Sequence, residues 1–221
     1  MKKKLIIFGD SGFAEIAYLY FTEEGEYEVV AFCVEKEFLN KKKIFNLNII
    51  TFDQLSSIYS PIDHFFFAAV TYKKMNDLRS RISNSAKKMG YKLARYISPY
   101  SFIGPKTSIG EHCFIFENNV IQPFVTIKNN VIIWSGNHIG HHSTVYENCF
   151  ISSHAVISGH CTIGPNSFIG VNATVSNNID VGKYNWIGPS CTIMSNTEPD
   201  AMHFCKTTHK AKISSIKFFN R

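Results

Sequence analysis

Residues 115–145 read IFENNVIQPFVTIKNNVIIWSGNHIGHHSTV, and a branched aliphatic residue recurs in this stretch at every sixth position. The same spacing continues in both directions, so that all seventeen positions from 97 to 193 in steps of six are Ile or Val. Each of these residue types is roughly a tenth or less of an average protein, so chance does not produce such a run.

A second class of position, four residues after each branched one, is nearly always small. Branched and small residues alternating at six-residue spacing are typical of a parallel β-helix, in which each flat face is a short strand and each corner a turn. Three hexads make one triangular coil, so residues 18 apart are expected to stack roughly 4.8 Å apart. Four of the six cysteines belong to the small class, which predicts that they pack in the interior: Cys113, Cys149, Cys161 and Cys191.

The span 97–198 resembles the left-handed β-helix of the hexapeptide-repeat acyltransferases. The handedness is implied by this resemblance alone, because right-handed crossovers are the general rule. A stacked repeat needs its two ends covered. We expect the N-terminal segment to cover the first end and the C-terminal tail, 199–221, to cover the other.

Residues 1–96 have a different pattern of apolar residues. KLIIFGDSGFAEIAYLY (4–20) indicates a buried strand, a glycine turn and a helix, and YEVVAFCVE (27–35) indicates a second strand. MNDLRSRISNSAKKMG (75–90) indicates a further helix that ends at a glycine. Alternating strands and helices predict a small, Rossmann-like parallel α/β sheet in this front domain.

Gly9, Ser11 and Gly12 lie where backbone N–H groups and a helix N-terminus could hold a phosphate. The loop lacks the middle glycine of the dinucleotide fingerprint, so NAD is not expected. Glu35, at the end of the second strand, could accept hydrogen bonds from a ribose hydroxyl. A tight turn followed by a solvated glutamate is the alternative interpretation.

In front of a hexapeptide helix, the domain resembles that of nucleotide-sugar acetyltransferases of the bacillosamine and sialic-acid O-acetyltransferase type. The resemblance implies that the front domain holds the nucleotide of a sugar substrate. Thr71 and Tyr72 stand where this family commonly has a glycine-rich turn, so they join the expected substrate site.

Five of the nine histidines fall within residues 134–160. His141 lies two residues past a branched position, at an expected corner, and Gly159 follows 18 residues later. The resemblance implies that a corner histidine is the general base and that a backbone N–H one coil on holds the oxyanion. Imidazole titrates near working pH, and a fixed N–H donor stabilises a tetrahedral intermediate. The five are His138, His141, His142, His154 and His160.

His142 stands where many family members have the acidic residue that orients the base. His142 and Asn137 are therefore further catalytic candidates, and Glu147, a backbone carbonyl or a neighbouring chain are other possible acceptors. The competing interpretations are structural: Asn137 in a ladder with a residue 18 positions away, and His142 stacked with His160.

The resemblance also implies a homotrimer, with acetyl-CoA in the groove between two helices and active sites shared by adjacent chains. Lys210 and Lys212 of the basic tail are additional candidates for the phosphates of CoA. The candidate cofactor neighbours are Gly159, Gly170, Asn172, Ala173, Ile187, Gly188 and Lys206.

The function that these expectations favour is N-acetylation of a 4-amino-4,6-dideoxy sugar on UDP or dTDP, for surface-glycan synthesis. The alternatives are a sialic-acid-type O-acetyltransferase, a zinc lyase like the γ-carbonic anhydrases, and a non-catalytic sugar-nucleotide binder. No metal is expected, because the adjacent His141 and His142 project differently. Composition (45% hydrophobic, 18% charged) predicts a soluble, globular protein, and no apolar run approaches the length of a membrane span. The expected compartment is the cytoplasm. Nucleic acid is not an expected partner, because the sequence has no basic stripe with interleaved aromatic residues.

Overall fold

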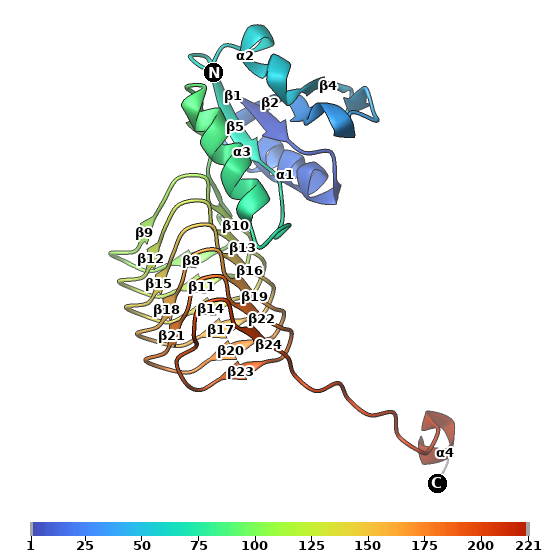
Figure 1. Cartoon of the computed structure of the whole chain (residues 1–221), viewed down its shortest axis with the longest axis vertical. Helices are drawn as coiled ribbons and strands as arrows, with labels where there is room; N and C mark the ends of the chain where they lie inside the picture. Colours follow the sequence, from blue (N-terminus) through green and yellow to red (C-terminus); the bar gives the residue numbers. More distant parts are fainter. Residues whose placement is uncertain (1, 220–221) are drawn as a thin grey trace.

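The computed structural model describes residues 2–219, which form a front unit and a β-helix, with the front unit near the first coils (Figure 1). The front-unit sheet has the strand order β3-β4-β2-β1-β5-β6. Neighbouring strands are parallel except in the β3–β4 hairpin, so the predicted parallel sheet is confirmed with one antiparallel edge added. Its strands are β1 (Lys3–Phe8), β2 (Tyr27–Val34), β3 (Lys43–Ile44), β4 (Leu47–Thr51), β5 (His64–Ala68) and β6 (Lys92–Leu93).

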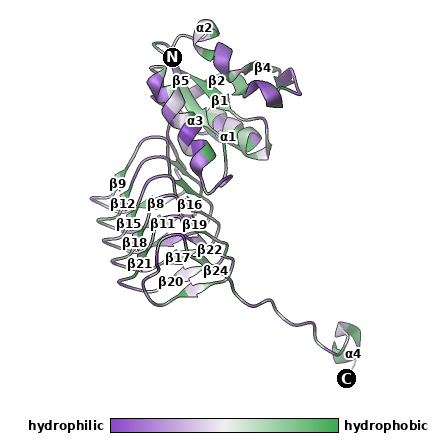
Figure 2. Cartoon of the chain, in the orientation of Figure 1, coloured by the Kyte–Doolittle hydropathy of each residue, from purple (hydrophilic) through white to green (hydrophobic). Residues whose placement is uncertain are grey.

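Two main helices, α1 (Gly12–Glu23) and α3 (Asp77–Lys88), cover opposite faces of this sheet. Leu5 and Ile7 of β1 share a core with α1, whereas Ile6 and Phe8 share a second core with α3. A strand buried on both faces reads as a continuous apolar run, which is what β1 shows in its sequence and in Figure 2. Three short elements complete the unit: η1 (Lys36–Phe38), η2 (Phe52–Gln54) and α2 (Leu55–Ile58).

The β-helix has three faces, each a sheet of parallel strands. We call them the docking face, which contacts the front unit, the open face, and the threonine face, whose outward side chains are mostly threonine. The docking face consists of β7 (Tyr96–Ile97), β10 (Phe114–Ile115), β13 (Ile132–Ile133), β16 (Phe150–Ile151), β19 (Phe168–Ile169), β22 (Trp186–Ile187) and β24 (Met202–His203). The open face consists of β8 (Phe102–Ile103), β11 (Val120–Ile121), β14 (His138–Ile139), β17 (Val156–Ile157), β20 (Thr174–Val175) and β23 (Thr192–Ile193). The threonine face consists of β9 (Ser108–Ile109), β12 (Thr126–Ile127), β15 (Thr144–Val145), β18 (Thr162–Ile163) and β21 (Asp180–Val181).

The strand register confirms the predicted 18-residue coil. Ile121, for example, pairs with Ile139, and Ile139 pairs with Ile157. The branched positions form one continuous core together with the small class, including Cys113 and Cys149. All four cysteines that were expected inside are buried free thiols.

The corner turns explain most of the histidine cluster. At six-residue intervals the corners contain a residue with positive φ, and Asn is frequent there. His142 (φ 60°), His154 (φ 59°) and His160 (φ 57°) occupy such positions. Asn and His are among the residue types enriched in this left-handed conformation. His141 is not one of them, so its presence needs another reason.

The front unit rests on the docking face through an aromatic ladder. The rings of Phe168 and Trp186, one coil apart, stack with centroids 4.0 Å apart. Tyr72 packs on Phe168 at 4.7 Å, and Phe13 of α1 packs on Phe114 at 5.7 Å. The orientation of the front unit on the β-helix is therefore fixed by packing.

Arg79 of α3 joins the two units from a fully buried position. Its guanidinium donates to the carbonyl oxygens of Thr71 (2.6 Å) and Asn148 (2.7 Å) and to the side chains of Asn76 (3.0 Å) and Asn130 (3.1 Å). Burial lowers the pKa of Arg79 to about 9. A cation solvated by carbonyl and amide dipoles substitutes here for an ion pair.

His112 is a second buried polar link. Its Nε2 accepts the N–H of Ala68 at 2.8 Å, and its Nδ1–H donates to Asn130 Oδ1 at 2.7 Å. Burial lowers the pKa of His112 from its ordinary 6.5 to about 3. The folded protein therefore holds this imidazole neutral in a region of pH where the unfolded chain protonates it.

Stability is expected to fall as the pH drops below 6.5, because the unfolded chain then binds a proton that folded His112 refuses. The loss from this residue is at most about 1.4 kcal/mol per pH unit until the folded pKa is reached. The measurement is the free energy of unfolding in urea at pH 7.5, 6 and 5. His112→Gln, which keeps an acceptor for Ala68, should flatten the profile, whereas His209→Gln in the exposed tail should not. An unchanged slope in His112→Gln would contradict this assignment.

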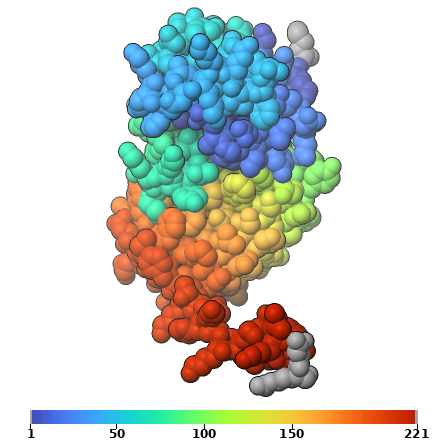
Figure 3. Space-filling model, turned by 90° about the vertical axis from the view of Figure 1, so that its right-hand side faces the viewer, coloured from blue at the N-terminus to red at the C-terminus, as the bar shows by residue number. Residues whose placement is uncertain are grey.

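The β-helix extends beyond the expected boundary at 198, because β24 pairs with β22. Residues 204–219 then project away from the body to the short helix α4 (Ser215–Phe219), as Figures 1 and 3 show. The expected cover from the tail is thus limited to its first residues. Across residues 2–219, no helix is both long enough and apolar enough to cross a bilayer.

Candidate active site

His141 and Gly159 meet at the corner between the open and threonine faces. His141 follows β14, and its backbone N–H donates to Gln122 Oε1 at 2.9 Å. A Cβ added to Gly159 would lie only 2.9 Å from Nε2 and Cε1 of His141. The imidazole therefore lies directly over the Gly159 backbone, and only glycine leaves room for it in this position.

His142 is the hydrogen-bond partner of the His141 ring. The two Nδ1 atoms are 3.1 Å apart, and the ring planes are nearly perpendicular, at 87°. One Nδ1 must carry a proton and the other must accept it. If His141 is the donor, its Nε2 presents a free lone pair on the side of Gly159, which is the tautomer that a general base requires.

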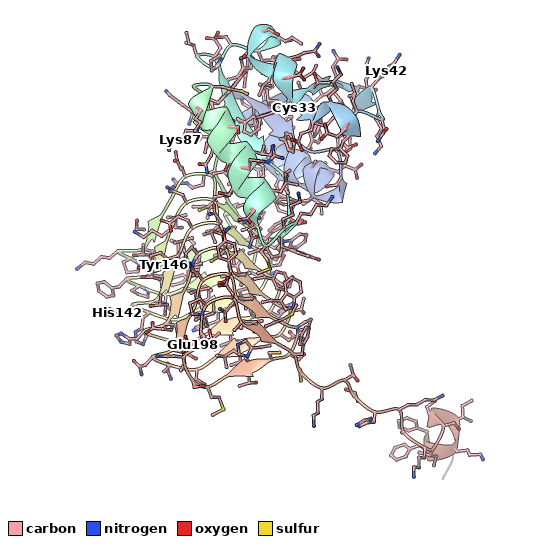
Figure 4. All side chains as sticks on the ribbon, in the orientation of Figure 1. Cys33, Lys42, Lys87, His142, Tyr146 and Glu198 are labelled. Carbon is pink, nitrogen blue, oxygen red and sulfur yellow. The ribbon has the colours of Figure 1, made fainter. Side chains whose placement is uncertain are left out.

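The rings of this corner form a stacked ladder, as the structural interpretation of His142 and His160 predicted. His142 stacks on His160 at 4.8 Å with an interplanar angle of 11°, and on Phe124 at 4.7 Å. Lys106 Nζ lies 5.4 Å from the centroid of the Phe124 ring. His142 projects outward from the β-helix in Figure 4, and His141 and His160 are exposed with it.

Asn137 is not part of this corner, which corrects its expected catalytic role. Its side chain is 1% exposed, accepts the N–H of Ala155 at 2.7 Å and donates to the carbonyl of Trp134. Asn119 bonds to the N–H of Asn137 in the same way, at 2.9 Å. Asn137 is a rung of an interior asparagine ladder, and all of its side-chain groups are used there.

The N–H of Gly159, the expected oxyanion donor, already has a partner. It donates to Oδ1 of exposed Asn177 at 3.0 Å. An incoming carbonyl oxygen would have to replace this amide oxygen. Sequence reasoning missed Asn177, although its position 18 residues after Gly159 was a signal for it.

The glycine loop of the front unit lies at the carboxyl edge of the parallel sheet, where ligands bind in open α/β folds. A Cβ on Gly9, whose φ is +117°, would lie 3.0 Å from the carbonyl of Ala69, which follows β5. Ser11 is the N-cap of α1, and its side chain makes no capping hydrogen bond. Around Gly12 there is open space. First-turn amides of such a helix suit an anion.

Three other expected substrate residues are already engaged. Glu35 forms an ion pair with Arg81 of α3 at 2.9 Å, and Arg81 was not predicted as a neighbour. The Thr71 carbonyl accepts a hydrogen bond from Arg79. The ring of Tyr72 packs on the aromatic ladder, so it belongs to the junction between the two units. Of the predicted set, Gly9, Ser11 and Gly12 retain the geometry of a binding loop.

A single chain does not bring this loop to His141. The front unit packs on the docking face, whereas His141 lies at the corner opposite that face of the triangular coil. The two half-sites of one chain therefore point to different sides of the molecule.

Besides Gly159 at the His141 corner, the expected CoA residues separate into three groups. Gly170, Asn172 and Gly188 lie at the corner between the docking and open faces. Ala173 and Ile187 are fully buried in the core, so their side chains cannot contact a ligand, which corrects that expectation. Three exposed tail lysines lie beyond β24: Lys206, Lys210 and Lys212.

Comparisons with known proteins agree with this architecture. Residues 106–141 match the bacterial transferase hexapeptide family (six repeats). A search of curated proteins by sequence finds no match.

Several solved structures have the same overall fold. The acetyltransferase domain of PglB from Neisseria gonorrhoeae FA1090, solved in complex with acetyl coenzyme A, has a TM-score of 0.81 and 22% identity, covering 91% of this chain and 96% of that one. PerB from Caulobacter crescentus, solved with CoA and GDP-perosamine, has a TM-score of 0.80 and 19% identity, with coverage of 90% and 92%. WeeI from Acinetobacter baumannii AYE has a TM-score of 0.56 and 16% identity, with coverage of 90% and 94%. The predicted α/β unit followed by a left-handed β-helix is thereby confirmed.

Proposed function

We propose that the protein transfers an acetyl group from acetyl-CoA to the amino group of a nucleotide-linked 4-amino-4,6-dideoxy sugar. The observation that carries the proposal is the corner geometry: His141 Nδ1 faces His142 Nδ1 at 3.1 Å, and its Nε2 lies over Gly159. Support comes from the fold, which is shared with the acetyltransferase domain of PglB and with PerB.

In the proposed reaction, the sugar amine attacks the thioester carbonyl while Nε2 of His141 accepts the proton that the nitrogen loses. The carbonyl oxygen becomes negative in the tetrahedral intermediate. It would take the place of Asn177 Oδ1 at the N–H of Gly159, a contact worth about 3–4 kcal/mol to the transition state. Collapse of the intermediate expels CoA as its thiolate, which takes a proton from the imidazolium and leaves the base ready for another turnover.

His142 acts in this proposal as a positioning residue. It holds the ring of His141 through the Nδ1 contact, in place of the carboxylate that the family resemblance led us to expect. A neutral imidazole stabilises the transient imidazolium less than a carboxylate would, because it supplies a dipole rather than a full negative charge. The stacked ring of His160 in turn restricts His142.

A homotrimer would complete the site. The open face exposes apolar side chains beside the His141 corner, namely Phe102 (56%), Val120 (39%) and Val156 (40%). The threonine face presents a polar row in the equivalent positions. A second copy seated on the open face would bury this apolar row. In such an assembly, CoA would lie in the groove between copies, and the glycine loop of one chain could reach His141 of another.

The site of action would be the cytoplasm, where acetyl-CoA and nucleotide sugars are made, and the product would enter surface-glycan synthesis. The base chemistry alone admits an oxygen acceptor as well, so a sugar O-acetyltransferase is the second candidate.

The test is a mass-spectrometric screen of acetyl-CoA-dependent acylation, using UDP-, dTDP- and GDP-linked 4-amino-4,6-dideoxy sugars with matched hydroxyl sugars. The expected result is the gain of one acetyl group on an amino sugar. Acetylation of hydroxyl sugars alone would replace the proposal with the O-acetyltransferase. Binding of nucleotide sugar in calorimetry without any acetylated product would indicate a non-catalytic binder.

A further inference from the structure

Three imidazoles converge at the candidate active site from two successive coils. His141 and His142 come from one corner and His160 from the corner above it. Each offers a ring nitrogen, and these three atoms all lie within 4.8 Å of one another. All three side chains are exposed, so an ion in solution can reach them.

The spacing is close to that of a first-row metal site. With metal–nitrogen bonds of about 2.0–2.1 Å, the ligating nitrogen atoms of two imidazoles in a tetrahedral site lie roughly 3.4 Å from each other. The Nδ1 atoms of His141 and His142 are already 3.1 Å apart, which corrects the expectation that these adjacent side chains project differently. His160 offers a ring nitrogen within 4.8 Å of the other two ligand atoms, and its ring is exposed, so it can turn out of its stack on His142 to complete the set.

The surroundings suit a cation held by neutral ligands. Phe124 covers the other side of His142, and it separates the histidines from Lys106 on the coil below. Three imidazoles without a carboxylate favour Zn²⁺, Cu²⁺ or Ni²⁺ over Mg²⁺ or Ca²⁺. A fourth position would remain open to water, as in sites with three protein ligands.

We propose that His141, His142 and His160 bind one divalent transition-metal ion per chain, and that the bound ion inhibits acetyl transfer. The inhibition rests on the proposed function. Whichever nitrogen of His141 binds the metal, the other one of the neutral ring carries the proton, so no lone pair remains to accept a proton from the sugar amine. The ion also breaks the Nδ1 contact between His141 and His142 if it binds there.

The first test is calorimetric titration of the chelator-treated, tag-free full chain with Zn²⁺. One ion per chain is expected, and both His160→Asn and His142→Asn should weaken binding at least about tenfold. Asparagine is chosen because both positions have positive φ (57° and 60°), which it tolerates. His209→Asn, in the exposed tail, is the matched control and should bind Zn²⁺ like the unaltered protein.

The second test measures acetyl transfer with and without Zn²⁺. The unaltered protein should be inhibited, and EDTA should restore its rate. His160→Asn should lose a much smaller fraction of its own Zn²⁺-free rate at the same Zn²⁺ concentration. Equal Zn²⁺ affinity in the unaltered protein and His160→Asn would overturn the site. Tight binding without inhibition would overturn its effect on His141. If no acceptor is acetylated at all, the proposed function fails, and the titration still decides whether the metal site exists.

Discussion

Replacing His141 with alanine is expected to lower kcat for acetyl transfer by about 10²- to 10⁴-fold, with little change in KM for acetyl-CoA. The imidazole that lies over Gly159 is then lost, and the attacking amine must release its proton to water. Initial rates of CoA thiol release at saturating acceptor measure the effect. The result separates a catalytic histidine from the corner histidines whose presence is explained by backbone conformation.

Two variants make this result specific. His154→Asn removes an exposed histidine from a different corner, keeps a residue that tolerates the positive φ of 59°, and should leave kcat within a few-fold of the unaltered protein. Asn177→Ala frees the N–H of Gly159, so kcat should stay the same or rise. A loss of about 10²-fold in Asn177→Ala would instead identify the Asn177 amide group as the oxyanion donor. Undiminished turnover in His141→Ala would remove His141 from the mechanism.

Replacing Arg79 with methionine is expected to lower the free energy of unfolding by about 3–5 kcal/mol. The guanidinium makes seven hydrogen bonds from a fully buried position. Methionine fills much of the volume but leaves several buried carbonyl oxygens without a donor, at about 1–3 kcal/mol each before relaxation. Urea unfolding monitored by tryptophan fluorescence, which reports the junction through Trp134 and Trp186, is the measurement.

Arg81→Met is the matched control, since it removes an arginine from the same helix that forms, within residues 2–219, a single half-exposed ion pair, with Glu35. It should cost no more than about 1 kcal/mol. Arg79→Lys, which keeps the charge with fewer donors, should fall between the two. Equal losses in Arg79→Met and Arg81→Met would show that the buried guanidinium does not hold the units together.

The β-helix could be predicted from the sequence because a period of six fixes both the strand and the side-chain direction. The same arithmetic explains three errors at the site. Asn137 and Ala173 each lie four residues after a branched position, in the class that points inward, so they should not have been assigned to a ligand. Ile187 is itself a branched core position. His142, His154 and His160 share a third class, three residues after the branched one, whose φ is positive.

The junction could not be predicted in this way. The junction joins segments whose sequence patterns are unrelated and which meet only when one unit docks on the other. Examples are the contacts of Arg79 with Asn130 and Asn148, and of Tyr72 with Phe168. Periodicity indicates which side chains each unit buries in its own core, and it carries no information about the contacts between the two units. The partner of Glu35 was missed for a related reason: Arg81 comes from a helix that follows much later in the chain, and periodicity does not show which helix lies beside the end of β2.

The three-sided coil also restricts how a chain of this kind can change length during evolution. Inserting one hexad would turn everything downstream by a third of a revolution, so His141 would leave its edge while Gly159 stayed one level above it. Inserting three hexads would only lengthen the β-helix by one full turn, because pairing partners recur after 18 residues. Viable insertions between the front unit and the histidine corner should therefore have a multiple of 18 residues, or form loops that project outward at the edges, where they leave the stacking undisturbed.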